Sequence, residues 1–259
     1  MKKFEGKVAL VTGAGGGIGK AIVRSFAQEG AKVVAVDLKE EFVTPLVEEL
    51  KAAGHDVIGI AANVAERASV QQAFDKALDT YGKVDIMANN AGVIRIGSAT
   101  DITDEDWDYV MNINAKGVFI CTQIALKHML PRKEGAIINT ASIAGKLGMP
   151  HLSHYCASKF AVIGYTNTVA REVASSGVTV NAICPGIVGT GMWRGEDGMA
   201  NRTKLEGETE EQSWERNKKF YIPQGVEQTP EDIAEGVLYL AGAKHVTGQA
   251  LAVDGGTTL

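Results

Sequence analysis

Residues 8–19 read VALVTGAGGGIG, an apolar run of strand-forming residues that passes directly into a cluster of glycines. An amphipathic helical pattern begins at Ile18 and continues to residue 28. Glycines let the backbone approach a pyrophosphate, and the start of a helix offers free N–H groups and positive dipole character. Glycine-rich tight turns share this pattern, but its position between a first strand and a helix is the context that dinucleotide binding requires. The segment therefore predicts a dinucleotide site.

Asp37 ends the second predicted strand, eighteen residues after Gly19. An acidic side chain at this point accepts hydrogen bonds from both ribose hydroxyls of adenosine, and its charge repels a 2′-phosphate. The glycine loop contains no arginine that would attract such a phosphate, and Lys39 is the only nearby cation. Asp37 thus favours NAD as the cofactor; the alternative is an aspartate that caps a helix.

The rest of the chain alternates short apolar runs with amphipathic helical stretches. The runs are rich in Val, Ile and Ala, as is typical of parallel strands covered on both faces. This alternation predicts an α/β Rossmann fold, a doubly wound parallel sheet of seven strands in one domain over residues 1–259. The expected strands are 8–11, 32–36, 57–61, 84–88, 136–139, 178–184 and 251–253. The expected helices are 18–28, 40–53, 68–81, 104–130, 154–175 and 230–241.

Charged residues crowd only one segment, residues 193–221, which indicates a mobile helical insert. We expect this insert, about residues 190–222, to form a lid beside the substrate.

Tyr155 and Lys159 are four residues apart in a predicted helix, so their side chains lie on one helical face. A cation beside a phenol favours the phenolate, and lowering the tyrosine pKa by about two units permits proton exchange with an alcohol or ketone oxygen. In isolation such a pair is usually an ordinary helix face. The other motifs of the chain give it chemical meaning.

Composition narrows the class of protein. The 259 residues are 45% hydrophobic and 22% charged, and the net charge is −5 with no basic run. These values fit a globular enzyme and argue against nucleic-acid binding. Three widely spaced cysteines, and the lack of an apolar run that resembles a signal peptide or a membrane span, favour a soluble cytoplasmic protein. The acidic cluster at residues 101–108 lacks the glycine and the terminal glutamate of a calcium loop, so we expect no metal site.

Several further motifs follow one another along the chain in a fixed order. They are Thr12-Gly13-x-x-x-Gly17-x-Gly19, Asn89-Asn90-Ala91-Gly92, Asn114 before Ala115-Lys116-Gly117, Ser142, Tyr155 with Lys159, Pro185-Gly186, and Val253-Asp254-Gly255-Gly256. Together, over nearly the whole chain, they resemble the short-chain dehydrogenase/reductase family. Ser142 precedes Tyr155 by thirteen residues, the usual interval in that family.

The resemblance implies a catalytic group of four residues. Tyr155 would be the general acid and base, and Lys159 would lower its pKa and bind the nicotinamide ribose. Ser142 would hold and polarise the substrate oxygen. Asn114 would sit at an irregularity in a long helix and hold a proton-relay water through its backbone; Asn112 is the competing candidate.

The resemblance also implies which residues contact NAD. They are Gly13, Gly17, Ile18, Gly19, Asp37, Asn63, Val64, Asn90, Ala91, Gly92, Tyr155, Lys159, Pro185, Gly186, Val188, Thr190 and Met192. Asn63 departs from the family pattern, which often has aspartate there to face the adenine amine. An amide oxygen still accepts that hydrogen bond.

Substrate residues are implied around Ser142 and Tyr155. The expected set is Ile94, Ser142, Ile143, His151, Tyr155, Ile187 and Trp193, with His151 and His154 as candidate polar contacts or as surface residues. The apolar majority favours a small or medium secondary alcohol or ketone. Residues 186–193 and the long insert resemble bacterial acetoin/butanediol and polyol dehydrogenases.

Two other functions share this scaffold. A reductase of 3-oxoacyl thioesters is one, although Asp37 and the missing loop arginine speak against the NADPH that such enzymes commonly prefer. A regulator that binds NAD without chemistry is the other, but such proteins tend to lose the tyrosine and the lysine. The apolar stretches 104–130 and 154–175 resemble the helices that pair between subunits in family tetramers, so we expect a homotetramer.

Overall fold

The computed structural model describes residues 2–259 and contains one seven-stranded sheet in which all neighbouring strands are parallel. The strands are β1 (Val8–Thr12), β2 (Lys32–Asp37), β3 (Val57–Ala61), β4 (Ile86–Asn89), β5 (Gly135–Thr140), β6 (Val178–Pro185) and β7 (Ala250–Val253). Their order across the sheet is β3-β2-β1-β4-β5-β6-β7. This order confirms the predicted doubly wound Rossmann-type sheet.

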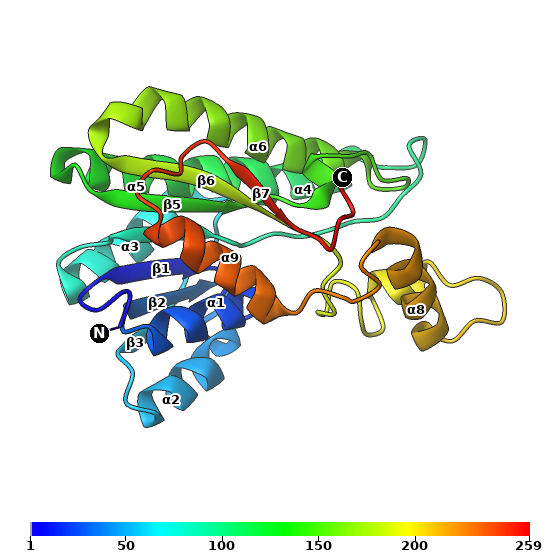
Figure 1. The fold of residues 1–259 in the computed structure, drawn as a ribbon, viewed down its shortest axis with the longest axis horizontal. Helices are drawn as coiled ribbons and strands as arrows, with labels where there is room; N and C mark the ends of the chain where they lie inside the picture. Colours follow the sequence, from blue (N-terminus) through cyan, green and yellow to red (C-terminus); the bar gives the residue numbers. More distant parts are fainter. Residues whose placement is uncertain (1) are drawn as a thin grey trace.

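Helices cover both faces of the sheet (Figure 1). They are α1 (Gly17–Gln28), α2 (Thr44–Ala52), α3 (Arg67–Tyr81), α4 (Asp104–Met111), α5 (Gly117–Arg132), α6 (Ser153–Val173), α7 (Met199–Arg202), α8 (Glu210–Tyr221) and α9 (Pro230–Gly242). The apolar side chains of α1, α2 and α9 form one core with the sheet, and those of α3, α5 and α6 form the other. Burial on both faces explains why the strands lack polar alternation.

The predicted helix 104–130 is broken in its middle. A π-helical turn, η2 (Asn112–Lys116), separates α4 from α5. The turn begins one residue after α4 ends and contains Asn114, so the irregularity expected at that residue is confirmed. Turns of this type are rare and concentrate at functional sites.

The winding direction of the sheet changes between β1 and β4, which are hydrogen-bonded neighbours. Ligands of open α/β sheets bind at such a switch point, beyond the carboxyl ends of the strands. Here the glycine loop follows β1 and the Asn90 segment follows β4. The fold therefore brings these two sequence motifs together.

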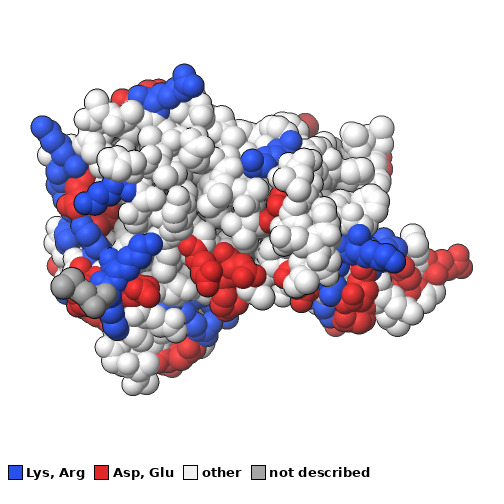
Figure 2. Space-filling model, in the orientation of Figure 1, with Lys and Arg blue, Asp and Glu red and all other residues white. Residues whose placement is uncertain are grey.

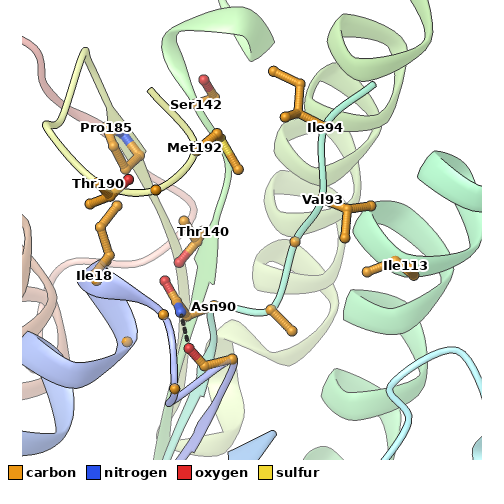
Figure 3. Close-up of a pocket in the computed structure, with 18 of the residues that line it drawn as sticks. Ile18, Asn90, Val93, Ile94, Ile113, Thr140, Ser142, Pro185, Thr190 and Met192 are labelled. Carbon is orange, nitrogen blue, oxygen red and sulfur yellow. Dashed lines mark hydrogen bonds between the residues drawn. The ribbon is translucent and has the colours of Figure 1, made fainter. Parts of the chain in front are cut away.

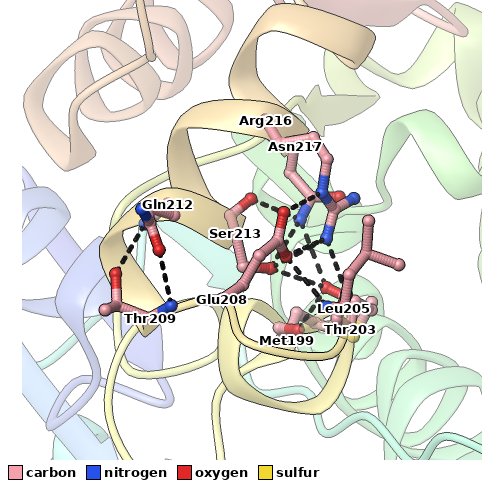
Figure 4. A network of polar contacts seen from close by, with 9 residues as sticks. All are labelled: Met199, Thr203, Leu205, Glu208, Thr209, Gln212, Ser213, Arg216 and Asn217. Atoms are coloured by element: carbon pink, nitrogen blue, oxygen red, sulfur yellow. Dashed lines mark hydrogen bonds and ion pairs between the residues drawn. The ribbon is translucent and has the colours of Figure 1, made fainter.

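The segment of residues 190–222 leaves the sheet after β6 and carries α7 and α8, which lie beyond the carboxyl ends of the strands (Figure 1). On the face seen in Figure 2, acidic and basic side chains lie next to one another over this segment. A polar network connects its two helices. Arg216 bonds Glu208 and the Thr203 carbonyl, and Asn217 bonds Thr203 and Ser213 (Figure 4).

The end of α8 is fastened to the residues that follow β7. The Thr257 hydroxyl donates to the Tyr221 carbonyl at 2.7 Å, and the Gln224 N–H donates to the Gly255 carbonyl at 3.1 Å. The buried Asp254 carboxylate holds this tail in shape by accepting from the Thr258 N–H at 3.0 Å. The 190–222 segment is thus tied to the sheet at both of its ends.

Within residues 2–259, no helix is both long enough and apolar enough to cross a membrane.

Candidate active site

A cavity of about 890 Å³ opens at the switch point of the sheet. One end of the cavity is formed by the glycine loop and by the residues at the ends of β2 and β4. The other end is formed by α6, the loop after β5 and the start of the 190–222 segment. Figure 3 shows Ile18 and Thr190 on one side and Val93 and Ile113 on the other. The volume lies within the range of small-ligand and cofactor sites.

The glycine loop fits closely against the segment after β4. Gly13 has a φ of 65°, and a Cβ on it would lie 2.8 Å from the Ala91 Cα, so any other residue would separate the two segments. The Asn90 side-chain amide donates to the Thr12 carbonyl at 3.2 Å. It also donates to the Gly13 carbonyl at 3.2 Å (Figure 3). Asn90 therefore fixes the shape of the loop as well as lining the cavity.

Asp37 points its carboxylate back at the glycine loop. One oxygen accepts the Gly15 N–H at 2.8 Å and the other accepts the Leu38 N–H at 2.7 Å. The next helical turn, Glu40–Phe42, begins after Lys39 and receives no side-chain cap, so Asp37 does not serve as a helix N-cap. The carboxylate instead lines the cavity as a fixed negative charge.

The Asn63 side-chain amide is held by hydrogen bonds to nearby residues. Its amide oxygen accepts the Ala65 N–H at 3.1 Å, and its amide nitrogen donates to Glu66 at 2.9 Å. Asn63 and Val64 both line the cavity. A carbonyl oxygen has a second lone pair, so Asn63 retains one acceptor position.

Tyr155 and Lys159 project from α6 into the cavity, and Ser142 reaches it from the loop after β5. The Lys159 Nζ lies 5.6 Å from the centre of the Tyr155 ring and donates to the Thr140 carbonyl at 2.8 Å. The Ser142 hydroxyl accepts the Ala144 N–H at 3.1 Å, which holds its extended backbone at the start of a short 3-10 turn. All three side chains are buried, with exposed fractions of 8% or less.

The expected lowering of the Tyr155 pKa is not found in the protein alone. Burial raises the pKa of Tyr155 to about 12, although a hydrogen bond with Ser142 acts in the opposite direction. Burial also lowers the pKa of Lys159 to about 8. Desolvation penalises the charged form of each group, and it is the largest influence on both pKa values. At pH 7 the pair is an ammonium beside a neutral phenol.

Asn114 is fully buried behind the cavity and does not line it. Its side chain accepts the Val93 N–H at 2.8 Å and donates to the Val93 carbonyl at 2.9 Å and to the Ser158 hydroxyl at 3.1 Å. It therefore joins the cavity-lining segment after β4 to the helix that carries Tyr155. Asn112 lies in the same π-helical turn and is partly exposed.

The cavity matches the requirements of a dinucleotide. Its pyrophosphate end is formed by glycines at the N-terminus of α1, where a Cβ on Gly17 would lie 2.6 Å from the Thr190 methyl carbon. Its adenosine end offers the Asp37 carboxylate. Every residue that the sequence predicts for cofactor contact lines this one cavity.

Two residues predicted for substrate contact do not line the cavity. His151 is exposed, with a φ of 64°, and its carbonyl accepts the Gly97 N–H at 3.0 Å. Ile187 is completely buried in a cluster behind the wall. Both residues are close in sequence to residues that line the cavity, but the backbone turns their side chains away from it. His154, offered as a surface histidine or a polar contact, is also fully buried outside the cavity.

Other residues that line the cavity near Tyr155 were not predicted from the sequence. They are Val93, Tyr109, Ile113, Met149, Leu152 and Met199. Met149 and Leu152 lie just before Tyr155, which is the one sequence signal that pointed to them. The others reach the cavity only through the turn after β4, the π-helical break and the fold of the 190–222 segment.

The protein has a parallel sheet with a glycine loop at its switch point, and the adjoining cavity contains a serine, a tyrosine and a lysine. These features define a Rossmann-type dinucleotide-binding protein. Residues 7–200 match the family model described as short chain dehydrogenase. The chain belongs to this family of oxidoreductases, which act on alcohol and carbonyl groups with a nicotinamide dinucleotide.

Similar proteins cover the chain from end to end. The 3-oxoacyl-(acyl-carrier-protein) reductase of Thermotoga maritima is 38% identical over 99% of this chain and 100% of its own length. Oxidoreductase UcpA of Salmonella typhimurium is 38% identical over 100% and 97% of the two chains. The 2-(S)-hydroxypropyl-CoM dehydrogenase 3 of Xanthobacter autotrophicus is 38% identical over 99% and 98%.

Proposed function

We propose that the protein is an NAD-dependent oxidoreductase that transfers a hydride between nicotinamide and a small or medium, uncharged secondary alcohol or ketone. The observation that carries this proposal is the position of Ser142, Tyr155 and Lys159 in the same cavity as the glycine loop. When bound, the nicotinamide ring supplies or accepts the hydride.

The residues of the chain control the proton and the substrate oxygen. In ketone reduction, the carbonyl carbon gains the hydride and the Tyr155 Oη gives its proton to the carbonyl oxygen, so that an alcohol forms. The Lys159 ammonium stabilises the phenolate that remains, and the Ser142 hydroxyl donates to the oxygen as its negative charge develops. Alcohol oxidation runs through the same groups in reverse. Asn114 supports the reaction by holding Val93 and α6 in register.

Asp37 supports NAD over NADP. Its carboxylate faces the end of the cavity where an adenosine ribose would bind, and a 2′-phosphate there would meet a fixed negative charge. Lys39 is exposed and paired with Glu41 at 3.3 Å, so it offers little compensation. The space beside Gly15 is filled by Phe42, which leaves no room for a basic side chain at that position.

The substrate class is supported by the apolar wall. Ile94, Ile143, Met149, Leu152 and Trp193 surround the cavity around Tyr155, with no charged side chain among them. Such a wall fits an uncharged substrate of the acetoin, diol or polyol type. The three cysteines are buried free thiols, which supports a reducing, cytoplasmic compartment.

A second candidate is reduction of 3-oxoacyl thioesters, because one similar protein is named a 3-oxoacyl-(acyl-carrier-protein) reductase. Initial rates with acetoin and with an acetoacetyl thioester, each measured with NADH and NADPH, separate the two candidates. We expect the larger rate with acetoin and NADH; a clear preference for the thioester with NADPH would favour the second candidate. A purely NAD-binding regulator, the third alternative, would be silent with every pair.

The test of the proposed chemistry is Tyr155→Phe. The variant keeps the ring that packs in the wall but has no proton to exchange, so we expect turnover to fall by about 10²–10⁴-fold. NAD binding, measured by calorimetry, should change little. Tyr239→Phe, at an exposed position on α9, is the matched control and should keep full activity. Near-normal turnover of Tyr155→Phe would refute the assignment.

A further inference from the structure

His154 is the second residue of α6 and directly precedes Tyr155. Its side chain is 0% exposed, and neither ring nitrogen has a hydrogen-bond partner among residues 2–259. It does not line the cavity, so it has no contact with a substrate there. Buried polar groups almost always have partners, and an exception of this kind in the turn that carries Tyr155 needs a physical reason.

We propose that His154 is a positioning residue for Tyr155: its imidazole must remain neutral for the first turn of α6 to stay packed, and its protonation disables the site in acid. The activity part of this proposal rests on the proposed oxidoreductase function. The structural part does not.

A charged imidazole is poorly accommodated at this position. The neutral ring has one N–H, whereas the imidazolium has two and a full positive charge, and no acceptor among the described residues receives either. The ring also lies in the first turn of a 21-residue helix, where the positive end of the helix dipole opposes a cation. Both effects favour the neutral form.

The charged groups around His154 do not offset these effects. Burial lowers the pKa of His154; the Asp106 carboxylate acts against this lowering, and the Arg95 guanidinium adds to it. Asp106 belongs to α4, which packs against α6, and it is paired with Arg95 at 3.5 Å. The neighbouring π-helical turn contributes only Lys116, which is exposed, and the 3-10 turn Ile143–Gly145 contains no titratable residue.

The state of His154 is transmitted to Tyr155 through the backbone. The two residues are consecutive, and the next residue, Cys156, bonds the Leu152 carbonyl at 2.7 Å to close the first turn. The loop before the helix is held by the bond from Gly97 to His151. An imidazolium that moves toward water must therefore rotate or open this turn, which shifts the Tyr155 hydroxyl relative to Ser142.

The direction of the pH effect follows from the lowered pKa. Histidine in an unfolded chain titrates at about 6.5. Above that pH the ring is neutral in both the packed and the loosened states, so packing is fully stable. As the pH falls below about 6.5, the loosened state binds the proton first, and the packed state loses stability until the pH passes the lowered pKa.

The experiment compares wild type, His154→Leu and His154→Asn with His151→Asn, an exposed control in the same segment. We measure kcat/KM from pH 5 to 8 and the melting temperature at pH 7.5 and 5.5. Wild type and the control should show an acid limb in kcat/KM whose midpoint lies below the ordinary histidine value of about 6.5. Beyond that midpoint the loss should be up to tenfold per pH unit for a single protonation. The His154 variants should lose this acid limb and show a smaller drop in melting temperature.

Histidine ring NMR supplies a readout that needs no substrate. The His154 signal should remain in its neutral form well below about pH 6.5 and should change only where the acid limb of kcat/KM appears. A His154 that titrates near 6.5 in the intact fold, or variants that keep the wild-type acid limb and melting-temperature drop, would overturn the proposal. If His154→Leu does not fold, His154→Asn decides. If no alcohol is oxidised by any variant, the NMR and melting data still test the inference while the proposed function alone fails.

Discussion

Burial works against charge on both members of the Tyr155–Lys159 pair. The pKa of Tyr155 is raised to about 12, which moves it away from neutral pH. The pKa of Lys159 is lowered to about 8, which moves it towards neutral pH. The protein alone is therefore set to donate a proton rather than to take one. A positive charge on the nicotinamide ring would favour the phenolate, which links proton transfer to the oxidised form of the cofactor.

We propose that Asp37 decides the choice between NAD and NADP. Replacing it by serine removes the negative charge but leaves an oxygen that can accept one backbone N–H, so the loop should keep its shape. We expect kcat/KM with NADP to rise about tenfold, equivalent to about 1.4 kcal/mol, and kcat/KM with NAD to fall. Steady-state rates with the two cofactors measure both changes.

Glu48→Gln on α2 is the control for that experiment, because it removes a carboxylate that does not line the cavity. Its cofactor ratio should match wild type. If Asp37→Ser discriminates against NADP as strongly as wild type does, another group must exclude the 2′-phosphate.

At the scale of the elements, the 190–222 segment carries its own structure. Two features stabilise α8: a capping box between Thr209 and Gln212, and the Arg216 guanidinium, which bonds both oxygens of Glu208 at 2.9 Å. The Arg216 hydrogen bonds lower the pKa of Glu208 to about 2, so this pair persists in mild acid. Trp214 of α8 in turn packs on Trp193, which lines the cavity, with ring centres 5.9 Å apart.

Arg216→Ala should therefore loosen the cavity wall at Trp193, where we propose that the substrate binds. Without the guanidinium, α8 loses its bonds to Glu208 and to the Thr203 carbonyl, and Trp193 loses firm support. We expect KM for the alcohol to rise several-fold, with NAD affinity within twofold of wild type. Lys219→Ala removes an exposed cation from the same helix and should leave both values unchanged. An unaltered KM for Arg216→Ala would show that the network does not support the site.

The sequence predicts which helices and strands form better than it predicts where they begin, end or break. The strands and most helices follow from the spacing of apolar residues along the sequence, because the residues that pack on the sheet recur at a regular interval in each element. The split of helix 104–130 was indicated only as an irregularity at Asn114, since a π-helical turn has no propensity signature of its own. The expected strand 84–88 begins later than predicted. β4 starts at Ile86, and the buried carboxylate of Asp85 before it accepts the Val8 N–H.

The site shows the same division. The glycines of the glycine motif and both residues of the tyrosine–lysine motif line the cavity, because backbone geometry fixes them there. Side-chain direction in loops was not predictable: His151 and Ile187 are neighbours of lining residues and yet point away. The complete burial of His154 was equally hidden, because it depends on how α4 packs against α6.

At the scale of the molecule, aromatic side chains on α4, α5 and α6 remain exposed. Trp107, Phe119 and Phe160 are 43%, 38% and 48% accessible. Surface of this kind on adjacent helices is costly for a monomer to leave in water. We propose that these helices pair with those of a second copy, as part of a homotetramer.

Phe160→Glu should weaken this assembly, because it places a charge in a desolvated contact. Light scattering at micromolar concentration should show a tetramer for wild type and a smaller species for the variant. Phe220→Glu replaces an even more exposed aromatic residue on α8 and should remain tetrameric. A wild-type protein that scatters as a stable monomer would overturn the proposal.

The fastening of α8 to the residues after β7 has a consequence for protein engineering. Tyr221 and Gln224 contact Thr257 and Gly255, so the end of the 190–222 segment and the end of the sheet form one unit although more than thirty positions separate them. A chimaera that grafts a relative's residues 190–222 onto this scaffold would meet foreign partners at 254–258. Exchanging both pieces together keeps their mutual contacts, and such paired grafts are the ones we expect to inherit the donor's selectivity.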